Sequence, residues 1–189
     1  TPGDPETFYS YTSFNRPQSI YRMNIRSGKS SIFAEPDLNF DPERYQVEQR
    51  FYASKDGTKV PMFIVRRADV AASGEAVPTL LYGYGGFSIN LTPAYSPARL
   101  AFLEAGGIVV VANLRGGTEQ GETWHRQGML GNKQQVFDDL IACAEQLIDD
   151  GIAGQAVNDE AVVAGGGHPR RDDQFMSARF GHPDGSGLL

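Results

Sequence analysis

Residues 79–87, Thr-Leu-Leu-Tyr-Gly-Tyr-Gly-Gly-Phe, join a short apolar strand to a glycine-rich turn. Glycine lets the backbone turn tightly after a strand, and here it leaves the aromatic side chains of Tyr84 and Phe87 near the strand's end. In open α/β sheets, ligands bind at the edge where the strands end. This stretch therefore predicts a strand of an α/β sheet together with a candidate binding edge.

The residues on either side of this stretch extend the pattern. Residues 68–77 are rich in small side chains and are predicted to be a loop. Ser96 and Pro97 are typical of a helix N-cap and first turn, and Gly106 ends the helix that they open. Residues 108–112, Ile-Val-Val-Val-Ala, are all apolar, as expected for a strand buried on both faces. Strands that alternate with helices favour an α/β fold with a mostly parallel sheet.

A second helix is predicted over residues 136–150, because apolar residues recur there at helical spacing. Asp138 and Asp139 fall in its predicted first turn, where the helix dipole favours negative charge. This placement explains the acidic pair better than a metal site does. Gly151 ends the helix, and residues 161–164 are predicted to form the next strand of the sheet.

The N-terminal part of the chain has a different character. Residues 1–35 contain short aromatic-rich runs separated by turns, which indicate a β-meander that needs neighbouring strands for stability. A connector with prolines and aspartates at 35–43 predicts a domain boundary. Beyond it, the turn Asp56-Gly57 within residues 45–65 indicates a β-hairpin.

Composition narrows the class of protein. With 189 residues, of which 40% are hydrophobic, the chain can bury a core. Its net charge of -6 and the absence of a basic patch argue against nucleic acid and membrane partners. The single cysteine, Cys143, and the lack of a signal-peptide pattern lead us to expect a cytoplasmic protein. One cysteine and three dispersed histidines give no zinc-ligand spacing, so no metal or cofactor is expected.

A second block of distinctive sequence lies between residues 113 and 139. It contains Asn-Leu-Arg-Gly-Gly at 113–117, Gly-Glu-Thr-Trp-His at 121–125, Gly-Met-Leu-Gly-Asn-Lys-Gln at 128–134 and Val-Phe-Asp-Asp at 136–139. Together with the turn at 81–87, this block resembles the peptidase domain of the prolyl oligopeptidase family, over about residues 5–164. The Tyr-Gly-Tyr-Gly-Gly-Phe form resembles the proline-specific branch of the family rather than the branch that cleaves after basic residues.

The resemblance implies that the chain is an internal piece of a longer protein, in agreement with a start at Thr1 rather than at a methionine. Residues 1–40 would be the remnant of the last β-propeller blade, and residues 45–166 the N-terminal part of an α/β-hydrolase peptidase domain. Residues 167–189 would be an unrelated polar tail, which we expect to be disordered. The implied activity is hydrolysis of short peptides after proline, with short proline-containing peptides as partners and the oligomeric state left open.

The resemblance also implies roles for the two aromatic residues of the turn. The hydroxyl of Tyr84 would donate to the oxyanion hole, and Phe87 would line the pocket for the substrate's proline. A phenol O–H suits a developing oxyanion, and loss of such a donor typically costs on the order of 10²–10³ in rate. Without the resemblance, both residues are explained better as loop and core aromatics.

The predicted strand at 161–164 runs into Gly-Gly-Gly-His-Pro at 165–169, where the family carries its nucleophilic serine in a Gly-x-Ser-x-Gly turn. Gly167 occupies the expected serine position, and His168 the next one, whose backbone N–H would be the second oxyanion donor. The aspartate and histidine of the triad follow much later in such folds, so we expect this chain to be inactive as written. The abrupt change of composition after Gly166 favours a discontinuity such as a frameshift.

Two further functions stay open. The chain could be a non-catalytic fragment that binds proline-containing peptides weakly, or an interaction fragment whose lone blade pairs through its open edge with another chain. We also expect exposed apolar surface, because the blade lacks its propeller. The remaining polar and aromatic candidates are expected to be structural rather than catalytic: Arg115, Glu119, Glu122, Trp124, His125 and Cys143.

Overall fold

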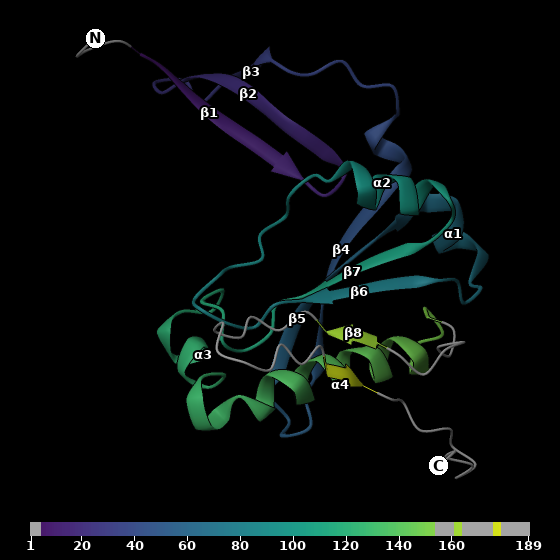
Figure 1. Cartoon of the computed structure of the whole chain (residues 1–189). Helices are drawn as coiled ribbons and strands as arrows, with labels where there is room; N and C mark the ends of the chain where they lie inside the picture. The colour runs from purple at the N-terminus through teal and green to yellow at the C-terminus, as the bar shows by residue number, and fades with distance from the viewer. Residues whose placement is uncertain (1–4, 154–160, 164–175, 179–189) are drawn as a thin grey trace.

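The computed structural model describes residues 5–153, 161–163 and 176–178. The strands in these ranges form a three-stranded sheet in the order β1-β2-β3, a four-stranded sheet in the order β4-β5-β7-β6, and the pair β8-β9. Figure 1 shows the three-stranded sheet set apart from the layers around the four-stranded sheet.

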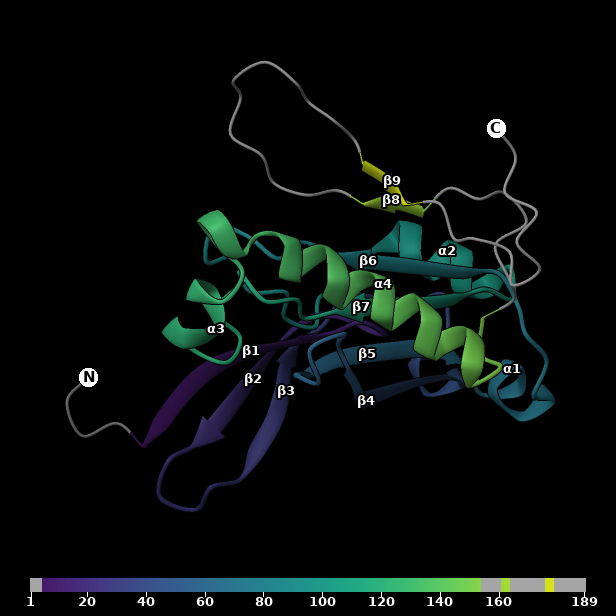
Figure 2. The ribbon, with the colours of Figure 1, turned by 90° about the horizontal axis from the view of Figure 1, so that it is seen from below.

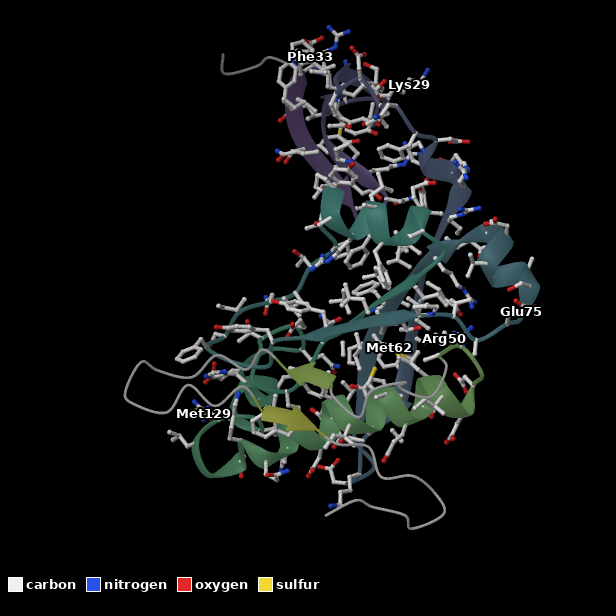
Figure 3. All side chains as sticks on the ribbon, turned by 45° about the vertical axis from the view of Figure 1, so that its right-hand side comes forward. Lys29, Phe33, Arg50, Met62, Glu75 and Met129 are labelled. Carbon is white, nitrogen blue, oxygen red and sulfur yellow. The ribbon has the colours of Figure 1, made fainter. Side chains whose placement is uncertain are left out.

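The three-stranded sheet is antiparallel throughout and confirms the predicted meander. The side chains of Phe8 and Tyr9 point to opposite faces of β1, and both are largely exposed. Phe8 contacts Phe33 edge-on, with ring centroids 4.9 Å apart, and this end of the molecule is labelled in Figure 3. Apolar surface is therefore exposed on both faces, as expected for an isolated meander. Its strands are β1 (Glu6–Ser13), β2 (Arg16–Asn24) and β3 (Ser30–Ala34).

The four-stranded sheet confirms the predicted α/β class but is mixed rather than mostly parallel. The β4–β5 and β5–β7 pairs are antiparallel, and only β6–β7 is parallel. A parallel pair needs a crossover connection, and α2 provides the one crossover between described strands of this sheet, whereas β4 and β5 are joined by the predicted hairpin. The strands are β4 (Tyr45–Ala53), β5 (Lys59–Arg67), β6 (Thr79–Gly83) and β7 (Ile108–Ala112).

Helices cover both faces of this sheet. Ile108 and Val110 of β7 pack in one core cluster with residues of α4, and Val109 and Val111 pack in another with Leu103 of α2. The predicted burial of β7 on both faces is thereby confirmed, and Figures 1 and 2 show α2 and α4 on opposite sides of the sheet. The helices are α1 (Ala68–Ser73), α2 (Pro97–Glu104), α3 (Glu122–Arg126), α4 (Gln134–Asp149) and the 3-10 turns η1 (Pro42–Arg44) and η2 (Leu130–Asn132).

Three local expectations need correction. The small-residue segment 68–77 forms the short helix α1 in its first half, because alanine favours a helix where nothing breaks it, and Gly74 then ends the helix in a left-handed conformation. Strand β8 (Ala161–Val163) pairs antiparallel with β9 (Met176–Ala178) rather than extending the larger sheet. Three residues of the predicted disordered tail therefore form a strand. Strands β8 and β9 supply each other's hydrogen-bond partners.

No helix within the described ranges is both long enough and apolar enough to cross a membrane.

Candidate active site

The turn that follows β6 lies at the carboxyl edge of the parallel strand pair. Gly83, the last residue of β6, pairs with Ala112, the last residue of β7. Tyr84 and Asn113 therefore leave the sheet side by side, at the edge where the sequence predicted a binding site. Tyr84 is partly buried, whereas the ring of Phe87 is 57% exposed.

The backbone of this turn is strained. Phe87 has a φ of 50° and Ser88 a φ of 56°, so two consecutive residues that are not glycine lie in the left-handed region. A bulky residue in that region is an outlier, and such strain persists only where the surrounding structure enforces it. Strained backbone conformations of this kind cluster at ligand-binding and catalytic sites, and here the strained residue carries an exposed aromatic ring.

Two glycines bring the turn and the segment after α3 against the segment after β7. A Cβ at Gly116, which has a φ of 97°, would lie 2.5 Å from the carbonyl oxygen of Gly85. A Cβ at Gly128 would lie 2.6 Å from the carbonyl oxygen of Arg115. The turn, the segment after β7 and the segment after α3 are thus packed backbone to backbone. Only residues without a side chain permit this approach.

Hydrogen bonds fasten both ends of the turn. At its start, Lys133 donates from Nζ to the carbonyl oxygen of Gly85 over 2.6 Å. At its end, Thr118 donates from Oγ1 to the carbonyl of Ser88 over 3.1 Å. Glu119 accepts from the backbone N–H of Leu91 over 2.9 Å, so the polar contacts predicted for Glu119 are confirmed. The turn is held on each side by segments that follow β7.

A buried ion pair lies beneath this arrangement. The side chain of Arg115 is 2% exposed and that of Asp139 is fully buried, and their closest atoms are 2.5 Å apart. Asp139 also accepts from the Ser54 hydroxyl over 2.5 Å, and from the backbone N–H of Arg115 over 3.1 Å. The predicted structural role of Arg115 is confirmed. The placement of Asp138 and Asp139 in the first turn is wrong, because α4 begins at Gln134 and both lie in its second turn, which carries Asp139 toward the sheet.

The ion pair extends to the turn of the β4–β5 hairpin. Arg115 donates from Nη1 to Asp56 over 2.6 Å. Burial alone would lower the pKa of the Arg115 guanidinium, but hydrogen bonds to Asp139 and Asp56 raise it above its ordinary value. Conversely, the hydrogen bond from Arg115 lowers the pKa of Asp56 to about 2. Arg115 therefore stays charged and joins the hairpin, α4 and the segment that leads to Gly116.

Because Asp56 ionises more readily in the folded state, its contribution to stability depends on pH. It is fully present above the ordinary pKa of 3.8 and is lost as pH falls toward about 2. We expect Asp56→Asn to lower the melting temperature near neutral pH and to differ little from wild type at about pH 2. The difference should correspond to less than about 1 kcal/mol, because the Asp56 side chain is 45% exposed.

Thermal unfolding followed by circular dichroism across this pH range measures the effect. Asp37→Asn, in the exposed connector, is the matched control. A difference between Asp56→Asn and wild type that is the same at every pH would contradict the prediction. It would place the cost in the hairpin turn rather than in the charge.

The other sequence candidates have structural positions. The indole of Trp124 donates to the carbonyl of Leu114 over 3.1 Å, and Nδ1 of His125 lies 2.6 Å from the carbonyl oxygen of Gly116. Glu122 pairs with Arg126 on the exposed side of α3 and does not shape the turn. The structural roles predicted for Trp124 and His125 are confirmed.

Cys143 of α4 is fully buried, and its sulfur lies 3.6 Å from that of Met62 in the sheet. Met62 is labelled in Figure 3. Burial raises the pKa of the Cys143 thiol to about 12, which makes it unreactive. Its predicted structural role is confirmed. In the described part of the chain, no group of three or more His, Cys, Asp or Glu side chains is placed to hold a metal ion. Gly167 and His168 lie outside the described residues.

Sequence reasoning missed two residues of this site. Asn113 donates from Nδ2 to the carbonyl of Leu91 over 2.8 Å, and Lys133 reaches Gly85. Asn113 carried a usable signal, because it directly follows an apolar strand that was predicted to be parallel to its neighbour. Lys133 stands at the start of a helix, where a cation is unfavourable, and that misplaced charge was its signal.

A mixed sheet covered by helices on both faces, with a strained aromatic turn at the end of a parallel strand, defines the first part of an α/β-hydrolase domain. The sequence profile described as the prolyl oligopeptidase family matches residues 93–167. Solved structures of prolyl oligopeptidases superpose on the chain. Over this part of its sequence the chain is similar to the prolyl oligopeptidase family.

Several named proteins are similar to the chain. A prolyl endopeptidase from Elizabethkingia miricola is 44% identical over 148 residues, which cover 78% of this chain and 21% of that protein. The prolyl oligopeptidase ophP of Omphalotus olearius is 43% identical over 86% of this chain and 22% of its own length. The chain thus spans about a fifth of the length of these relatives.

Two solved structures likewise match the chain over about a fifth of their own length. One, from a study of two prolyl endopeptidases, is 50% identical with a TM-score of 0.72, over 80% of this chain and 22% of its own. The other is prolyl oligopeptidase B from Galerina marginata bound to a 25mer macrocyclization substrate. It is 37% identical with a TM-score of 0.74, over 82% of this chain and 22% of its own.

Proposed function

We propose that this chain supplies the oxyanion-binding and proline-binding part of a serine peptidase that hydrolyses short peptides on the carboxyl side of proline. The observation that carries the proposal is the turn itself: Phe87 holds an exposed ring on a strained backbone, beside Tyr84, at the carboxyl edge of β6. Strain of this kind is kept where a site needs it. Relatives that are prolyl endopeptidases support the same assignment.

Each aromatic residue has a distinct part in this proposal. The Tyr84 hydroxyl donates a hydrogen bond to the negative charge that develops on the carbonyl oxygen of the scissile bond. The Phe87 ring packs against the proline ring and excludes water from it. The contacts that hold Gly85 and Ser88 keep the two side chains in a fixed relation before substrate arrives.

The nucleophile itself would come from the segment after β8. Gly167 takes the serine position in this assignment, and the backbone N–H of His168 is the second oxyanion donor. A glycine has no side-chain oxygen with which to attack a carbonyl carbon, so the chain as given binds peptide without cleaving it. In the same proposal, residues 1–40 are the end of a propeller, residues 45–166 the start of the peptidase domain and residues 167–189 a separate tail.

Peptide binding tests this assignment directly. We expect a short proline-containing peptide to bind the chain, measured by titration calorimetry, and Phe87→Ala to weaken binding about tenfold or more, since burial of an aromatic ring is worth about 1.5–3 kcal/mol. Tyr84→Phe should bind the peptide as wild type does, because its hydroxyl acts only on charge formed in the transition state. A fluorophosphonate probe should leave the chain unlabelled.

The matched control is Phe51→Ala, which removes a ring 60% exposed on β4, away from the turn. Equal peptide affinity in Phe87→Ala and wild type would overturn the role of Phe87. Labelling by the fluorophosphonate would show that the chain carries a nucleophile that Gly167 cannot supply. Binding without labelling is the result that supports the proposal.

A further inference from the structure

Lys133 is placed against the charge preference of the helix that it begins. It is the N-cap residue of α4, and the first turn of that helix contains no acidic residue. The N-terminus of a helix carries partial positive charge from its free N–H groups, so a lysine there is unfavourable. The Lys133 side chain makes no capping hydrogen bond to its own helix. A residue that conflicts with the charge preference of its own helix is expected mainly at functional positions.

The Lys133 side chain reaches instead to the turn after β6. Its ammonium group donates to the carbonyl oxygen of Gly85 over 2.6 Å, across 48 residues of sequence. Burial lowers the pKa of Lys133 below its ordinary value. The charge is thus partly removed from water in order to make this one contact. A hydrogen bond from a charged donor is also stronger and shorter than one from a neutral donor.

The Gly85 carbonyl has little access to any other donor. The backbone of Gly116 covers it so closely that a Cβ at that residue would lie 2.5 Å from the oxygen. Gly85 itself is buried, and a Cβ placed on it would strike Val136, one turn along the helix from Lys133. A buried carbonyl without a partner is costly, so the ammonium group fills a need that the fold creates.

We propose that Lys133 is a positioning residue for Tyr84: its ammonium group fixes the carbonyl of Gly85, the residue that directly follows Tyr84. Because Gly85 is bonded directly to Tyr84, a fixed Gly85 constrains the backbone from which the phenol projects. The inference rests on the proposed function for the role of Tyr84, while the hold of Lys133 on Gly85 stands on its own geometry. In the sequence, Lys133 lies between Met129, which is labelled in Figure 3, and the first residue of α4.

The test follows the Gly85 carbonyl carbon by NMR in the full chain labelled with carbonyl-¹³C glycine. In wild type, its chemical shift should change with pH as Lys133 loses its proton, with a midpoint below 10.5. Lys133→Met should abolish this titration and speed hydrogen exchange of the Ile89 amide, which donates within the turn, about tenfold. Lys133→Arg should keep exchange slow but show no titration, because arginine stays charged.

The control is Lys29→Met, an exposed lysine between β2 and β3. It should leave both signals unchanged, and circular dichroism checks that every variant is folded. Unchanged exchange and an unchanged titration in Lys133→Met would overturn the inference, as would equally fast exchange in both Lys133 variants. Wild-type signals as expected, in a chain that binds no proline peptide, would overturn the proposed function and leave the hold on Gly85 in place.

Discussion

Replacing Arg115 with methionine should lower the free energy of unfolding by about 3–5 kcal/mol, the largest effect we expect from a single side chain here. The reason is the buried carboxylate of Asp139, which the substitution leaves without its ion-pair partner. Asp139 is fully buried, and without the Arg115 side chain its carboxylate keeps the Ser54 hydroxyl and the backbone N–H of residue 115 as partners but loses the compensating charge. Urea unfolding of both proteins, followed by far-UV circular dichroism, measures the difference.

A second substitution separates the cost of a stranded charge from the value of the pair. The double variant Arg115→Met with Asp139→Leu should recover much of the lost stability, because a buried ion pair can often be replaced by apolar residues at little cost. The surface control is Arg126→Met, whose side chain is 72% exposed beside Glu122, and it should cost less than about 1 kcal/mol. If Arg115→Met costs no more than Arg126→Met, Asp139 does not carry a buried charge.

The elements of this fold that could be predicted are those with a local signal. An all-apolar run gave β7, helical spacing gave α4, and Asp56-Gly57 gave the hairpin between β4 and β5. Helix α3 has only five residues, too few for periodicity to appear, and it was not predicted. Local patterns also placed Tyr84 and Phe87 at the end of a strand, where the structure has them.

What could not be predicted are contacts between distant residues. Arg115 and Asp139 lie 24 residues apart and share no pattern, yet together they join three elements. One sign was available: Asp139 lies three residues after Val136 and four before Cys143, which puts it on the apolar face of α4. An acidic residue on that face needs a buried partner, and charge at a helix start was the wrong explanation for it.

Replacing Gly116 with alanine should have an effect similar in size to that of Arg115→Met, because it combines two separate costs. With a φ of 97°, Gly116 is in a backbone conformation that a residue with a Cβ adopts at a cost of about 1–3 kcal/mol. The added methyl group would also lie 2.5 Å from the carbonyl oxygen of Gly85, and overlap of this kind costs a further ~1–3 kcal/mol. The nearest atoms belong to the backbone of Gly85 and Gly128, so no side chain can move away to relieve the overlap.

Two other glycines separate these costs. Gly57→Ala has a comparable φ of 81° but meets no atom within 4 Å, so it should show the backbone cost alone. Gly131→Ala meets no atom within 4 Å and has no left-handed φ, so it should be nearly neutral. Stability should therefore fall in the order Gly131, Gly57, Gly116, and the Ile89 amide should exchange faster in Gly116→Ala alone, because that overlap displaces the turn. If Gly116→Ala matches Gly57→Ala in both measurements, the backbone contact with Gly85 does not hold the turn that carries Tyr84.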